Sequence, residues 1–335
     1  MPLMSFDEAV ARSSDHRHVL MGNGFSIALR PEIFSYQALI DRAKIDELAG
    51  GREVFTALDT TDFEAVIRAA VDAAKLVQIF DGSSPISAQL DELASGLREK
   101  LVQAIAGSHP PHPFEVSEDQ YRACRRFLGL FKRRYTLNYD LLLYWALMRT
   151  EIDDLQLESD DGFRDSPWEE DANYVSWIEH HSATVVYLHG AVHLFDAGHE
   201  LIKYTWSRTQ IPLMDQIRVA LEQEKYPLFV AEGSTRQKFE KIVHSAYLHR
   251  AYRSFSSIEG DLFIYGHSLK SNDQHIYDAI SEGRISSIYV SVYGDENSQA
   301  NQEIMRSAEQ ISSMRRGRRP LNVHFFDAAS ARVWG

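Results

Sequence analysis

The chain has 335 residues, enough for one large α/β domain or for a domain that carries an insertion. Hydrophobic residues make up 44% and charged residues 25%, which is ordinary for a globular protein, and no apolar run is long enough to span a bilayer. The formal net charge of -13 argues against a general nucleic-acid binder, which needs a basic footprint.

Cysteine usage and the N-terminal segment bear on the compartment. Cys124 is the only cysteine, which excludes an internal disulfide and a zinc site of four cysteines within one chain. Residues 1–17 are acidic and lack the apolar core of a signal peptide. We therefore expect a cytoplasmic protein that does not associate with membranes.

The predicted elements alternate between short β runs and longer helical or irregular segments, which indicates a parallel sheet with crossover helices. The block at about 36–106 has helical spacing and few strand signals, so we expect a helical insertion after the first strand, with a helix start at Thr61-Asp62. In chain order we expect strand 18–21, the helical block 36–106, a proline-rich break at 108–113, helix 117–130, strand 134–137, helix 141–148, an acidic surface excursion at 151–171, strand 184–188, strand 228–231, helix 235–255, strand 262–265, helix 273–282, strand 287–292, helix 299–314 and strand 322–326.

These elements predict one α/β domain over residues 1–335. It has a Rossmann-like parallel sheet with flanking helices, and no zinc ribbon. A basic run ends the helix at 299–314, where Gly317 is expected to cap it and Arg315 and its neighbours complement the helix dipole; a surface for a phosphate-rich partner is the alternative.

Four short motifs follow strands, and each ends in small or polar residues. Ligands of open α/β sheets bind beyond the carboxyl ends of the strands, so four such ends point to one pocket. The motifs are Gly22-Asn23-Gly24-Phe25-Ser26, Thr136-Leu137-Asn138-Tyr139-Asp140, Leu188-His189-Gly190 and Gly266-His267-Ser268-Leu269.

The first motif favours a phosphate. Gly22 and Gly24 allow the backbone to approach a pyrophosphate closely, and Ser26 offers a hydroxyl donor. A plain strand-to-helix turn explains the same residues equally well. The third glycine of the dinucleotide fingerprint is absent, which weakens a reading as a redox dehydrogenase.

The second and third motifs carry groups suited to catalysis. The carboxamide of Asn138 can hold a sugar hydroxyl or a water, and His189 can exchange a proton near neutral pH. Asp140 serves a ligand or caps the helix that follows. His193 lies four residues after His189, but a pair without a third ligand is a weak metal signal.

The last motif suits the adenosine side of a nucleotide. Gly266, Ser268 and Asp273 offer groups for ribose hydroxyls and phosphate, although Asp273 is at least as well placed to cap a helix. A further strand-end turn, Glu232-Gly233-Ser234, has basic residues close behind it.

In this order the four motifs resemble those of the sirtuin superfamily of NAD-consuming enzymes, and most of all the sirtuin-like NADase domains of bacterial anti-phage defence. The resemblance spans Gly22 to Asp273. It implies that Gly22, Gly24 and Ser26 bind the pyrophosphate and that Asn138, with Asp140, works at the nicotinamide ribose. It also implies that His189 is the general base, while Gly266 and Ser268 hold the adenosine side.

The resemblance implies a function as well. Protein-deacylating sirtuins carry a four-cysteine zinc ribbon that this chain lacks, so the expected acceptor is water, NAD is the substrate and no metal is needed. The alternatives are a nucleotide-binding sensor without turnover, and a deacylase or ADP-ribosyltransferase without zinc. We expect a homo-oligomer and a protein trigger, such as a translocase-type ATPase or an Argonaute-type protein.

Overall fold

The computed structural model describes residues 3–34, 41–60, 63–110, 112–165, 172–179, 183–198, 200–223, 225, 227–230, 235–315 and 320–335. Outside this part of the chain lie the expected helix start at 61–62, the turn at 232–234 and the basic residues with their cap at 316–319. Within it, no helix combines the length and the apolar character that crossing a membrane requires.

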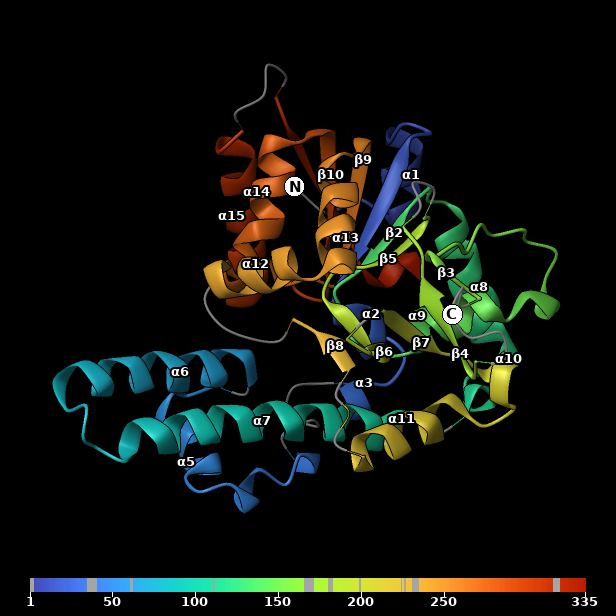
Figure 1. Ribbon diagram of the computed structural model, residues 1–335. Coiled ribbons are helices and arrows are strands. Elements are labelled where there is room, and N and C mark those ends of the chain that lie inside the picture. The colour runs from blue at the N-terminus through green and yellow to red at the C-terminus, as the bar shows by residue number, and fades with distance from the viewer. Residues whose placement is uncertain are drawn as a thin grey trace.

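The main sheet is six-stranded and parallel, in the order β11-β10-β9-β1-β2-β5. Figure 1 labels β10, β9, β2 and β5 among the strands of this sheet. Numbered along the chain, these strands follow the order 3-2-1-4-5-6 of dinucleotide-binding sheets, with the reversal between β1 and β9. The predicted Rossmann-like α/β fold is therefore confirmed. The strands are β1 (Arg17–Met21), β2 (Arg134–Thr136), β5 (Val185–Tyr187), β9 (Glu259–Tyr265), β10 (Arg284–Val292) and β11 (Asn322–Asp327).

Both faces of this sheet are covered by helices. Successive side chains of a strand point to opposite faces, so its apolar residues divide between two clusters. On β1, Val19 and Met21 join one apolar cluster, whereas Leu20 joins the other. The second cluster packs under α13 (Ala246–Ser256), α14 (Gln274–Glu282) and α15 (Gln299–Ser313). The other face packs against α1 (Phe6–Arg12) and α8 (Glu118–Gly129), as Phe6 and Phe127 show.

A second sheet, antiparallel and five-stranded, was not predicted. Its order is β3-β4-β7-β6-β8. The expected irregular excursion at 151–171 contains β3, and the strand expected at 228–231 belongs to this sheet rather than to the parallel one. The strands are three to seven residues long and show little polar alternation, so local pattern did not reveal them. They are β3 (Phe163–Asp165), β4 (Tyr174–Trp177), β6 (Gly190–Asp196), β7 (Leu201–Tyr204) and β8 (Pro227–Phe229).

The described part of the helical block consists of helices joined by turns and contains no strand. Helices α6 (Phe63–Phe80) and α7 (Ile86–Ser108) lie side by side and extend away from the two sheets (Figure 1). Phe63 and Leu101 are buried, whereas Ile79 and Phe80, at the turn between the helices, are exposed. The short helix α5 (Gly51–Ala57) belongs to this block, whereas α2 (Gly24–Ile27) and α3 (Pro31–Phe34) precede it.

The remaining helices connect strands within the second sheet or between the two sheets. The helix expected at 235–255 is two helices, because Ser245 separates them and its Oγ accepts a hydrogen bond from the Leu248 amide. These connecting helices are α9 (Leu142–Met148), α10 (Trp206–Thr209), α11 (Leu213–Glu222) and α12 (Thr235–His244).

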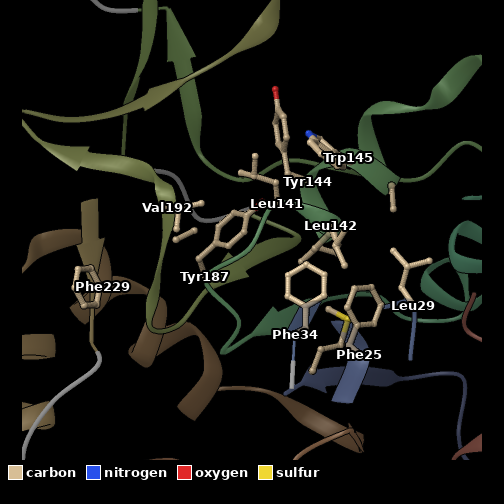
Figure 2. Close-up of a cluster of buried hydrophobic side chains, with 14 of the residues drawn as sticks. Phe25, Leu29, Phe34, Leu141, Leu142, Tyr144, Trp145, Tyr187, Val192 and Phe229 are labelled. Carbon is tan, nitrogen blue, oxygen red and sulfur yellow. The ribbon is translucent and has the colours of Figure 1, made fainter. Parts of the chain in front are cut away.

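One apolar cluster joins the helices after β1 to the second sheet (Figure 2). Aromatic and aliphatic side chains from α2, α3 and α9 meet those of β5, β6 and β8, so both sheets share a core beneath the carboxyl end of β1. The side chains labelled there are Phe25, Leu29, Phe34, Leu141, Leu142, Tyr144, Trp145, Tyr187, Val192 and Phe229.

Candidate functional site

A cavity of about 810 Å³ opens at the carboxyl ends of β1 and β9, where the strand order reverses. Its volume lies within the range of roughly 300–1,000 Å³ usual for small-molecule sites. All four motifs contribute to its wall. The motif residues that line it are Gly22, Asn23, Gly24, Leu137, Asn138, Tyr139, Asp140, His189, Gly266, His267 and Ser268, and Asp273 lines it as well.

The glycine turns after β1 and β9 pack directly against each other. The amide of Gly24 donates to the carbonyl of Gly266 at 2.8 Å, and that of Gly22 donates to Tyr265 at 2.9 Å. A Cβ on Gly24 would lie 2.5 Å from the Cα of Gly266. These glycines are therefore required for contact between the two turns. Because the two amides are engaged with β9 and the turn after it, a ligand would meet the surface of the turn rather than those donors.

Ser26 lies behind the cavity rather than in it. Its fully buried Oγ donates to Oδ2 of Asp140 at 2.5 Å and accepts from Nδ2 of Asn138 at 3.0 Å. This geometry does not favour the predicted contact between Ser26 and a phosphate, because its hydroxyl already bonds Asp140 and Asn138. Ser26 instead fixes the carboxamide of Asn138 at the cavity wall.

Asp140 lines the cavity, but both of its oxygens are engaged. Oδ1 accepts at 2.9 Å from the amide of Leu142, the first residue of α9, although the N-cap position of that helix is Leu141 and not Asp140. Burial raises the pKa of this carboxyl above its ordinary value. The neighbouring amide, Leu141, donates to Nε2 of His109 at 3.1 Å. His109 comes from the proline-rich break and was not predicted to support the site.

His189 follows β5 and lines the cavity with a nearly buried ring. Its Nε2 lies 3.0 Å from Nε2 of His275, the second residue of α14, and 3.9 Å from Oδ1 of Asp273. Burial lowers the pKa of His189 well below its ordinary value of 6.5 and that of His275 to about 4. Both rings are therefore neutral at pH 7, and His189 is in the state that accepts a proton.

Asp273 stands at the N-cap position of α14, as the helix-cap alternative expected, but its side chain makes no capping hydrogen bond to that helix. Its Oδ1 accepts from Nζ of Lys238 at 3.1 Å, and its Oδ2 lies 3.0 Å from Nε2 of His267. The amide of Leu269 donates to Nδ1 of His267, so the ring proton of His267 lies on Nε2 and is donated to Asp273. Burial alone would raise the pKa of Asp273, but the His267 hydrogen bond and the Lys238 charge hold it well below 3.8.

His189, Asp273 and His275 offer ligand atoms that all lie within 4.8 Å of one another, a spacing that a metal ion can bridge. Two imidazoles and a carboxylate are suitable ligands for zinc. Asp273, however, already carries a buried ammonium on the oxygen nearest His189, and Lys238 balances its charge. A divalent ion here would be repelled by that ammonium, so these residues fit a metal poorly.

The cavity also contains positive groups that the motifs did not indicate. Lys270 and Arg332 line it, as does Trp334, whose Nε1 donates to the carbonyl of Phe25 at 2.7 Å. The C-terminal residues thus pack on α2 and form one side of the cavity. No local pattern marks them as site residues, because only the tertiary fold brings them there.

His193 lies away from the cavity, on β6. Its fully buried ring packs between Tyr144 and Tyr187, with centroid distances of 5.2 Å to each. The structure therefore separates it from His189, as the weak metal signal of that pair suggested.

Comparison with protein families identifies the family of the chain. Residues 19–334 match the family described as "Domain of unknown function (DUF4917)", and the chain belongs to that family. No curated protein matches the chain.

Proposed function

We propose that the protein is an NAD glycohydrolase that cleaves NAD to nicotinamide and ADP-ribose. The observation that carries the proposal is the convergence of the four sirtuin-like motifs on one cavity at the strand-order reversal. This is the position at which sheets of this strand order bind dinucleotides. Asn138 and His189 come from different strands and line the same cavity.

The cavity charges support binding of NAD. Lys270 and Arg332 offer positive charge to the pyrophosphate of NAD. Ser268 and Asn272 offer hydrogen bonds to the ribose on its adenosine side. The nicotinamide ribose would lie between Asn138 and His189. Asn138, fixed by Ser26, would orient the ribose or the attacking water.

Bond cleavage builds positive charge on the ribose, as in other glycosyl transfers. The C1′–N bond breaks and its electron pair goes to the nicotinamide nitrogen, while water forms the new bond to C1′. His189, neutral at pH 7 because burial lowers its pKa, would take the proton of that water. None of these steps requires a metal, since nicotinamide leaves as a neutral molecule.

The setting of the reaction rests on the resemblance alone. It favours a cytoplasmic effector of anti-phage defence that depletes NAD on a trigger. A homo-oligomer, and a partner such as a translocase-type ATPase or an Argonaute-type protein, would restrain and release this activity.

Product analysis of the purified chain with NAD tests the proposal. We expect nicotinamide and ADP-ribose in equal amounts, with turnover reduced at least about 100-fold in His189→Ala and in Asn138→Ala. His193→Phe is the matched control, because it removes an equally buried histidine outside the cavity. NAD binding without turnover, at any protein concentration and with candidate partners, would favour the sensor. Transfer of the acyl group from an acyl-lysine peptide to ADP-ribose would favour the deacylase, and transfer of ADP-ribose to a protein the ADP-ribosyltransferase.

A further inference from the structure

The pair formed by His189 and His275 constrains where each ring carries its proton. Their Nε2 atoms lie 3.0 Å apart, so one nitrogen donates and the other accepts. If His275 donates, a neutral His189 carries its proton on Nδ1 and has no lone pair for the cavity. If His189 donates, its Nδ1 has the lone pair that a general base needs.

Asp273 favours the second arrangement, in which a neutral His275 carries its own proton on Nδ1, a buried atom that has no hydrogen-bond partner among the described residues. Its Oδ1 lies 3.9 Å from Nε2 of His189, and its negative charge attracts a proton to that nitrogen. The carboxylate is held in place by Lys238 and His267 on its two oxygens. Among the described residues, no hydrogen bond is made to Nδ1 of His189, which leaves this nitrogen for a ligand in the cavity.

We propose that His275 and Asp273 are positioning residues that act through His189. His275 accepts the Nε2 proton of His189 and fixes the tautomer whose Nδ1 takes a proton in the cavity. Asp273 stabilises the positive charge that His189 gains when it does so. The inference rests on the proposed NAD hydrolysis, in which the proton comes from the attacking water.

Substitutions at His275 separate positioning from folding. His275→Phe keeps a ring but removes the acceptor, so we expect kcat to fall roughly tenfold or more while KM for NAD changes little. His275→Gln restores an acceptor oxygen and should recover much of that loss. His193→Phe makes the same change in another fully buried histidine and should leave kcat and its pH profile unchanged.

The pH profile adds a readout that a structural role would not move. Removal of the acceptor changes the pH at which His189 takes up a proton. The acid limb of the kcat profile should therefore shift in His275→Phe and return toward the wild type in His275→Gln. Equal kcat and equal pH profiles in wild type and His275→Phe would overturn the proposal. A loss of kcat in His275→Phe that His275→Gln does not restore would overturn it as well.

Nitrogen-15 NMR of the histidine rings tests the tautomer without any turnover, so it stays informative if the protein proves not to hydrolyse NAD. We expect His189 to carry its proton on Nε2 in the wild type. A proton on Nδ1 would contradict the proposal. Stoichiometric zinc in the purified protein that is lost in His275→Phe would also contradict it, because the cluster would then be a metal site.

Discussion

At the scale of single residues, the site is a set of side chains that hold one another rather than a set of independent ligands. Ser26 holds Asn138 and Asp140, and His275 lies against His189. Four of these five residues were predicted to contact NAD or to act on it, and three of the four line the cavity: Asn138, Asp140 and His189. Ser26 lies behind the wall, and His275 belongs to no motif.

Ser26→Ala tests this support. The change leaves Oδ2 of the buried Asp140 carboxyl without its donor and Nδ2 of Asn138 without its acceptor, so we expect the free energy of unfolding to fall by about 1–3 kcal/mol. NAD turnover should fall with it. Ser87→Ala is the control, because it removes a single hydrogen bond, from Oγ to the Ala74 carbonyl, within the helical block. Wild-type stability and turnover in Ser26→Ala would contradict the supporting role.

The pH dependence of activity follows from His189. A general base works when unprotonated, and burial lowers the pKa of this ring well below 6.5. We therefore expect kcat/KM to rise with pH through a midpoint below 6.5 and to be level at neutral pH. Steady-state kinetics between pH 4 and 8 would measure this, and a midpoint above the ordinary histidine value would contradict it. The charged and titratable groups that act on His189 are Asp273, His275, Lys238 and His267.

At the scale of elements, the site depends on the contact between the turns after β1 and β9. Gly266 has a φ of +66°, and a Cβ there would lie 2.6 Å from the Cα of Gly24. Neither backbone can move away, because each turn directly follows a central strand of the sheet. The two turns therefore fix the floor of the cavity.

Three glycine substitutions separate backbone strain from collision. Gly294 has a φ of +76° with no atom within 4 Å of a Cβ, so Gly294→Ala should cost only about 1–2 kcal/mol. Gly24→Ala tests the collision without the strain: its Cβ meets main-chain atoms of Gly266, which should lower the free energy of unfolding by about 1–3 kcal/mol and disturb the cavity. Gly266→Ala combines strain and collision and should destabilise most. Denaturant unfolding measures the order, and equal losses in Gly294→Ala and Gly266→Ala would contradict the contact between turns.

At the scale of the whole molecule, the parallel sheet could be predicted because its strands are apolar runs that end in recognisable turns. The sheet at β3-β4-β7-β6-β8 could not, since its strands pair with partners on both sides of β5 in the sequence. The same reason hid Arg332, whose distance in sequence from the motifs gives no sign that it lines their cavity. Local pattern thus located the strand ends, and only the fold assembled the charges around them.

The most direct test of NAD hydrolysis at this cavity is a crystal structure of His189→Ala soaked with NAD, since this variant should bind the substrate without cleaving it. We predict the pyrophosphate across the turns after β1 and β9, and the nicotinamide ribose between Asn138 and the space vacated by the His189 ring. NAD bound outside this cavity, or with its nicotinamide ribose turned away from Asn138, would contradict the proposed site and its chemistry.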